Sequence, residues 1–184
     1  MKKLLLTAAL AFTVSGPALA QTDQTAAHTA SQAHAEAMAR YETALETYNV
    51  AQSHWDSGQR IHMAWNAQRR GWQTTPSGLQ YRVVGRPNKD GAQPVATDTV
   101  MVHYRGTLIN GAEFDSSYSR NEPASFPLNR VIGGWTEGVA LMHEGETYEF
   151  LIPPELAYGP RRMGNDIPAN SALYFTVELL KVNP

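Results

Sequence analysis

The sequence predicts an α+β protein in which a helical arm precedes an antiparallel sheet covered by one short helix. Residues 26–70 contain no proline and one glycine, and good helix formers dominate them. From residue 79 onwards, short segments alternate apolar and polar residues between turns rich in Gly, Pro, Asn and Asp. One helical stretch, residues 135–142, interrupts these segments. A single helix can cover the apolar face of the four or five strands that we expect.

Residues 1–20 are predicted to be a signal peptide that is cleaved near Ala20. Two lysines precede an eleven-residue apolar run, residues 4–14, and residues 18–20 show the small-x-small cleavage pattern. Eleven apolar residues fall short of the roughly 20 that span a bilayer, and no cysteine follows to carry a lipid anchor. We therefore expect a protein that is periplasmic or secreted.

The arm is predicted in residues 21–74, as two helices or one kinked helix. Its larger side chains recur at spacings of 3, 4, 3, 4 and 3, with Gln52 filling one position; they are Met38, Tyr41, Leu45, Tyr48 and Trp55. We call these the seam residues. The segment 56–59 then has the pattern of a break and a new N-cap. The seam is too narrow to enclose a core, so the arm either packs on the neighbouring domain or forms a homodimer.

The sheet domain is predicted in residues 75–184, with strands near 79–83, 99–109, 146–152 and 172–181. Alternation places Tyr104 on the inward face and His103 on the opposite face, where a surface role is its default. An acidic group at residues 144, 146 and 149 is expected to be a solvated strand edge rather than a catalytic pair.

The composition excludes several classes of function. The chain has 15 Lys+Arg against 17 Asp+Glu, a formal charge of −2, which disfavours a nucleic-acid binder. It has no cysteine, and its six histidines show no metal-ligand spacing. A nucleophile elbow, a phosphate-binding glycine loop and a dinucleotide fingerprint are absent from the sequence. An enzyme of this sequence would work without a nucleophile, a metal or a cofactor.

Four motifs, in order, carry a resemblance to a known family. They are VHYRGTL at 102–108 with FDSS at 114–117, VIGGWTEG at 131–138, IPPELAYG at 152–159, and IP at 167–168 leading to FTVEL at 175–179. On these motifs, residues 75–184 resemble the FKBP-type peptidyl-prolyl cis–trans isomerases. The segment TTPSGLQYRV at 74–83 and the alanine-rich arm are similar to periplasmic and surface members related to the macrophage infectivity potentiators.

The resemblance implies a twisted five-stranded antiparallel sheet wrapped around the short helix, with an apolar pocket between them. The residues it implies for catalysis are Asp115, Tyr158, Phe175 and Trp135, with Trp135 as the floor. Those it implies for substrate binding are Tyr104, Phe114, Val131, Ile132 and Ile167. Arg120 matches the family's arginine that pairs with the aspartate.

The resemblance also implies isomerisation of X–Pro bonds in unfolded or exported proteins, without a cofactor, and inhibition by macrolides such as tacrolimus or rapamycin. The alternative is a periplasmic chaperone or binding module with a vestigial pocket. Three departures from the family pattern bear on specificity. Ala124 stands where many members have a pocket-rim aromatic, the loop between residues 128 and 131 is two residues shorter, and Met163 stands where histidine is frequent.

Overall fold

The computed structural model describes residues 18–184, and the predicted signal peptide lies outside this range except for its last three residues. The chain divides into two compact units, with the boundary between Ala51 and Gln52. The first belongs to the long helix α1, Ala18–Asn66, and the second, Gln52–Pro184, contains the end of α1 and the whole sheet. No helix within residues 18–184 combines the length and the apolarity that crossing a membrane requires.

Helix α1 is continuous, so the predicted break at residues 56–59 is wrong. The side chains that suggested a new N-cap bind the domain instead. Asp56 accepts hydrogen bonds from Asn170 Nδ2, at 3.2 Å to each carboxylate oxygen, and the Gln59 side chain accepts one from the Ala172 N–H at 3.0 Å. A polar pair spaced like a capping box therefore serves a tertiary contact here.

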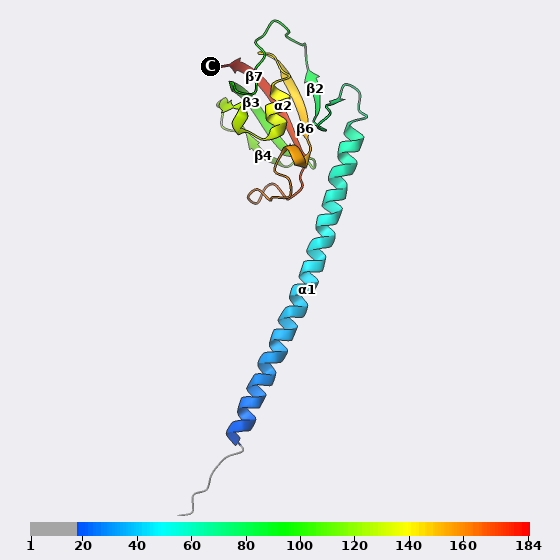
Figure 1. The fold of residues 1–184 in the computed structure, drawn as a ribbon, viewed down its shortest axis with the longest axis vertical. Helices are drawn as coiled ribbons and strands as arrows, with labels where there is room; N and C mark the ends of the chain where they lie inside the picture. Colours follow the sequence, from blue (N-terminus) through cyan, green and yellow to red (C-terminus); the bar gives the residue numbers. More distant parts are fainter. Residues whose placement is uncertain (1–17) are drawn as a thin grey trace, which may run out of the picture. The chain divides into compact units, whose positions relative to one another are not determined.

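Seven strands form one antiparallel sheet within the described residues: β1 Gln73–Thr74, β2 Gln80–Val84, β3 Thr99–Leu108, β4 Glu113–Ser116, β5 Ala124–Pro127, β6 Thr147–Ile152 and β7 Leu173–Val182. The strand order is β1-β2-β6-β7-β3-β4, and β5 also pairs with β3 (Figure 1). Because β5 pairs with residues 99–102 and β4 with residues 105–107, these two short strands share one edge position. The sheet is thus five strands wide beside the two-residue β1, and the predicted α+β fold is confirmed.

The short helix α2, Gly133–Val139, covers one face of the sheet. It begins two residues earlier and ends three residues earlier than the predicted stretch. A Cβ on Gly134 would lie 2.3 Å from the side chain of Ile152, so only glycine lets the helix backbone approach β6 this closely. Two 3-10 helices flank this region, η1 Leu128–Arg130 and η2 Pro154–Leu156. Close contact of helix and sheet sets the depth of the cavity described below.

The end of α1 covers the opposite face of the sheet, where Trp72, Leu151 and Ala172 form a second buried cluster. Gln80, which is 4% exposed, lies under this helix. Its side chain accepts a hydrogen bond from Asn66 Nδ2 at 2.8 Å and donates one to the Met63 carbonyl at 2.9 Å. For residues 52–66, the expectation that the arm packs on the neighbouring domain is therefore confirmed.

The predicted solvated acidic edge is wrong for Glu146, which is 2% exposed. Its carboxylate accepts hydrogen bonds from the backbone N–H groups of Asn88 and His143, both at 2.7 Å. Burial opposes ionisation, but these bonds and the nearby His143 outweigh it, so the pKa of Glu146 lies below its ordinary value. Alternation alone could not show that loop N–H groups converge on this side chain.

Candidate active site

A cavity of about 480 Å³ opens between α2 and the sheet. Its walls are formed by Tyr104, Asp115, Phe126, Arg130, Val131, Ile132, Trp135, Tyr158 and Phe175. Seven of the nine residues predicted for the site are among them. The other two, Phe114 and Ile167, do not line the cavity and belong to the hydrophobic cluster behind it.

Trp135 of α2 lies at the floor and is 4% exposed. Three aromatic rings meet it nearly at right angles, with centroids 5.3 Å away for Tyr104, 5.3 Å for Phe175 and 5.6 Å for Phe126. Edge-to-face contacts of this kind are favourable because the positive edge of one ring meets the negative face of the next. The floor is therefore a closely packed aromatic surface, in which the indole N–H of Trp135 is buried without a partner in the described part of the chain.

Phe114 supports the aromatic wall from behind, with its ring 5.5 Å from that of Phe175. Both rings lie against Gly106 of β3, where a Cβ would come within 2.7 Å of Phe114 and 2.8 Å of Phe175. Glycine at this register position leaves the space that the two rings occupy. Phe114 thus acts on the cavity through Phe175 and not by direct contact with its interior.

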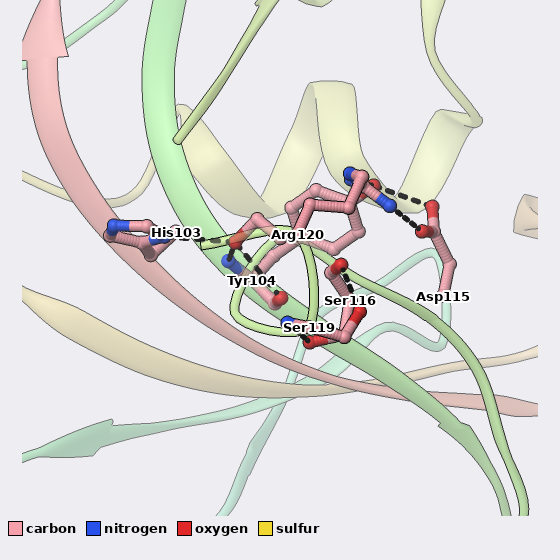
Figure 2. A network of polar contacts seen from close by, with 7 residues as sticks. His103, Tyr104, Asp115, Ser116, Ser119 and Arg120 are labelled. Carbon is pink, nitrogen blue, oxygen red and sulfur yellow. Dashed lines mark hydrogen bonds and ion pairs between the residues drawn. The ribbon is translucent and has the colours of Figure 1, made fainter. Parts of the chain in front are cut away.

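A polar corner interrupts the apolar wall at Asp115 of β4. The Tyr104 hydroxyl donates to one carboxylate oxygen at 2.5 Å, Arg120 donates to the other at 2.6 Å, and Arg120 also donates to the Tyr104 hydroxyl oxygen at 2.8 Å. Figure 2 shows the three side chains converging. Burial raises the pKa of Asp115, but the bonds from Tyr104 and Arg120 outweigh it, so this pKa lies below its ordinary value. Asp115 is an ionised and fixed carboxylate at neutral pH.

Serine side chains hold the loop after β4 against β3. Buried Ser117 accepts a hydrogen bond from the Tyr104 N–H at 2.8 Å, and Ser119 donates to the Ser116 carbonyl at 2.8 Å. These bonds fix the turn that carries Arg120.

His103 lies apart from the pair of Asp115 and Arg120, as Figure 2 shows. Its Nδ1 lies 3.0 Å from the Ser117 hydroxyl, in agreement with the predicted place of His103 on the other face of the strand.

The Ile132 N–H and the Tyr158 hydroxyl are among the hydrogen-bond donors at the cavity wall that have no partner in the described part of the chain. Ile132 is the N-cap of α2, and its carbonyl accepts bonds from Trp135 and Thr136 while its own N–H donates to nothing. The Tyr158 hydroxyl also makes no hydrogen bond. Burial, followed by the charge of Asp115, raises the pKa of Tyr158, so its hydroxyl keeps its proton at neutral pH. The wall can therefore donate to two carbonyl oxygens of a bound polypeptide.

Two cavity residues were not predicted, Phe126 and Arg130. Phe126 lies two residues after Ala124 in β5, on the same half-buried face, so period-two alternation from Ala124 could have identified it. Ala124 itself packs against the core. Arg130 ends η1, in the loop between residues 128 and 131, and no sequence pattern placed its side chain at the cavity.

The comparisons with known proteins agree with this geometry. Residues 91–180 match the family model described as FKBP-type peptidyl-prolyl cis-trans isomerase. The chain is 54% identical over 121 residues to the FKBP-type peptidyl-prolyl cis-trans isomerase FkpA of Aeromonas hydrophila, covering 66% of this chain and 44% of that protein. It is 44% identical over 117 residues to the outer membrane protein MIP of Legionella longbeachae, covering 64% and 49%. The chain thus spans about half the length of the curated relatives it matches.

Among solved structures, the crystal structure of FkpA from Escherichia coli is similar with a TM-score of 0.67 and 39% identity. The match covers 93% of this chain and 74% of that one. Sequence identity of this size over most of both chains comes with the same fold. This chain is a member of the FKBP-type peptidyl-prolyl cis–trans isomerase family.

Proposed function

We propose that this protein catalyses cis–trans isomerisation of X–Pro bonds in exported polypeptides and so assists their folding. The observation that carries the proposal is the pairing of two unpartnered donors, the Ile132 N–H and the Tyr158 hydroxyl, with an aromatic cavity of about 480 Å³. The amide barrier of about 18–20 kcal/mol reflects lost resonance, and no bond has to break. A site without a nucleophile is sufficient for this reaction.

The aromatic floor would favour the twisted amide over the planar one. A planar amide has a polarised carbonyl that water solvates well, whereas the twisted form is less polarised. A prolyl ring placed against Trp135 and Phe175 loses that water, which costs the planar form more. This is differential binding of the transition state. Lowering the barrier by about 4–6 kcal/mol gives an acceleration of roughly 10³–10⁴-fold.

The polar groups would orient the substrate for this rotation. The Ile132 N–H and the Tyr158 hydroxyl donate to substrate carbonyls and fix the ring over Trp135. The carboxylate of Asp115 either faces the carbonyl carbon as it rotates or holds the cavity together through Arg120. Both roles agree with its fixed geometry, and substitutions at Asp115 and Arg120 distinguish them.

A protease-free assay of X–Pro isomerisation, followed by NMR exchange on the mature chain, tests the proposal. We expect acceleration over the uncatalysed rate, and a loss of about 10-fold in kcat/KM in Tyr158→Phe, because one hydrogen bond to substrate contributes about 1–1.5 kcal/mol. Tyr81→Phe is the matched control, since that hydroxyl donates to Gln73 far from the cavity residues in the fold. A wild-type rate equal to the uncatalysed rate would contradict the proposal.

Export of the chain is part of the same proposal. The pattern of residues 1–20 supports cleavage near Ala20, and a relative of this chain is named an outer membrane protein. Mass spectrometry of the protein recovered from a bacterial periplasm should show a chain that begins at Gln21. A chain that keeps Met1 in the cytoplasm would contradict export.

We further propose a homodimer formed through the seam residues. In the single chain four of these side chains are exposed, Met38 and Leu45 by 44% each, Tyr41 by 60% and Tyr48 by 58%, whereas Trp55 packs partly buried against the core. The heptad spacing of the seam residues is that of helices that pack on helices. Leu45→Glu with Tyr48→Glu should give monomers in sedimentation at micromolar concentration. Thr43→Glu with Val50→Glu places the same charges on the opposite side of α1 and should leave the dimer intact. A wild-type monomer would contradict the proposal.

A further inference from the structure

One charged group at the cavity has no role in the mechanism above. Arg130 lines the cavity, is exposed, and ends η1 two residues before Ile132. In the described part of the chain its guanidinium makes no ion pair and no hydrogen bond. An arginine carries five N–H donors in a planar fork, which matches the two oxygens of a carboxylate.

The charges around the cavity do not cancel that of Arg130. The anion of the cavity wall, Asp115, is already neutralised by Arg120 at 2.6 Å. The formal charge of these three residues is therefore +1. Arg161, in the turn that follows Tyr158, is also exposed and its side chain has no partner in the described part of the chain. A carboxylate brought to this rim would meet an unpaired cation.

We propose that Arg130 is a specificity-determining residue that selects X–Pro sequences flanked by Asp or Glu. The proposal rests on the proposed isomerase function, because it places the proline on Trp135 with its chain held at Ile132. An extended chain advances about 3.5 Å per residue. The substrate side chains one to three positions from the proline therefore lie near Arg130, which is two residues before Ile132. The preferred substrates are acidic, proline-containing polypeptides.

Peptides that carry Glu, Gln or Lys at each of the three positions on either side of X–Pro test the proposal, with kcat/KM measured by NMR exchange. The readout is the ratio of kcat/KM for the Glu peptide to that for the isosteric Gln peptide. For the wild-type protein we expect a ratio of about 2–5 at the best position, which corresponds to about 0.4–1 kcal/mol and lies within the range of an exposed ion pair. The ratio should fall towards 1 in 1 M salt, where the Debye length is about 3 Å.

Variants of the full mature chain assign the preference to one side chain. Arg130→Gln should bring the ratio to about 1, Arg130→Lys should keep most of it, and Arg130→Glu should reverse it in favour of the Lys peptide. Arg86→Gln is the matched control, because Arg86 is exposed and lies outside the cavity lining. A merely structural role of Arg130 would change all peptides alike and leave the ratio unchanged.

The outcomes separate this inference from the function on which it rests. Activity on the Gln peptides with a wild-type ratio of 1 at every position would overturn the role of Arg130 and leave the isomerase intact. A preference that survives Arg130→Gln would also overturn it. Absence of acceleration for every peptide would overturn both proposals.

Discussion

The hydroxyl of Tyr104 donates a hydrogen bond to the carboxylate of Asp115 at 2.5 Å, and this bond fixes both side chains at the polar corner of the cavity. Burial, followed by the bond to Asp115, raises the pKa of Tyr104, while the same bond lowers that of Asp115. The pair is thus a fixed hydroxyl and a fixed anion at neutral pH. Whether catalysis uses the charge of Asp115 or only its position is a question that two substitutions answer.

Asp115→Asn keeps the shape of the corner and removes its charge, whereas Arg120→Gln keeps the charge and removes one tether. If the charge acts on the rotating amide, Asp115→Asn should lower kcat/KM about 10–100-fold, since bonds to charged groups contribute about 1.5–3 kcal/mol, and Arg120→Gln should cost less. Both melting temperatures are measured beside the rates. Equal losses of activity and stability in the two variants would assign Asp115 a structural role instead.

The aromatic wall depends on the absence of a side chain at Gly106. A Cβ there would lie 2.7 Å from Phe114 and 2.8 Å from Phe175. Gly106→Ala should therefore displace Phe175, lower the free energy of unfolding by about 1–3 kcal/mol, and lower isomerase activity. Gly58→Ala in α1 is the control, because nothing lies within 4 Å of its added Cβ. That variant should gain about 0.5–1 kcal/mol in urea unfolding, and a stable, fully active Gly106→Ala would contradict the argument.

The rim of the cavity sets the expected affinity for macrolides. Tacrolimus and rapamycin inhibit members of this family, and the resemblance matches Ala124 with a rim position that holds an aromatic ring in many members. Weak binding is therefore expected for the wild-type chain. Ala124→Phe should tighten the dissociation constant in calorimetry by about 3–10-fold, because an added aromatic contact contributes about 0.5–1.5 kcal/mol. An unchanged constant would contradict the rim argument.

The contact between α1 and the sheet should depend on pH through His62. Its Nε2 lies 3.0 Å from the Tyr174 hydroxyl, and burial, followed by the charge of Arg69, lowers its pKa. The folded state therefore takes up this proton at lower pH than the unfolded chain, for which the pKa is about 6.5. Stability is fully present above pH 6.5 and declines as the pH falls from there through the lowered pKa.

Urea unfolding at pH 7.5 and pH 5.5 measures this effect. The loss of stability on going to the lower pH should be smaller in His62→Asn than in the wild-type protein. His54→Asn replaces an exposed histidine of the same helix and should behave as the wild type. An equal loss of stability in all three proteins would show that His62 does not cause the pH dependence.

Local patterns predicted the elements that repeat with a regular period, and the family motifs predicted the cavity. Alternation placed Tyr104 inward, and its side chain is buried. What the sequence did not show was set by contacts between distant segments. Gln80 alternates like a solvent-facing residue but is buried by α1, and Glu146 is buried by loop N–H groups. No periodicity encodes such partners, because each side chain receives its environment from a segment elsewhere in the chain.

The cavity residues likewise divide into those that the sequence predicted and those that it did not. Trp135 and Phe175 belong to motifs whose residue types fix their positions on α2 and β7. Arg130 lies at the cavity because η1 ends there, which is a property of the chain path and not of residue type. The motif-based prediction therefore identified seven of the cavity residues and missed Phe126 and Arg130.

Truncation separates the two parts of α1. Residues 52–66 cover one face of the sheet, and the domain boundary predicted at residue 75 would remove them. A chain that starts at Gln52 should keep its stability and its short-peptide activity, since all the cavity residues lie beyond it. A chain that starts at Thr75 keeps the cavity residues but exposes Leu151 and leaves the Gln80 side chain without its partners. Exposure of this apolar surface to water costs about 25 cal/mol per Å², so this shorter chain should unfold at lower urea concentration.

Both truncated chains lack most of the exposed seam. The arm would raise the effective concentration of client prolines near the cavity, to the millimolar range for a short connection. If it does, both truncated chains should accelerate proline-limited refolding of a whole protein less than the full mature chain does. Both should also suppress the aggregation of that protein less. The seam variant Leu45→Glu with Tyr48→Glu, measured beside them, shows whether pairing of two chains is what matters. Equal refolding rates for the chain from Gln52 and the full mature chain would leave the arm without a part in client capture. Loss of short-peptide activity in the chain from Gln52 would instead make residues 21–51 part of the catalytic domain.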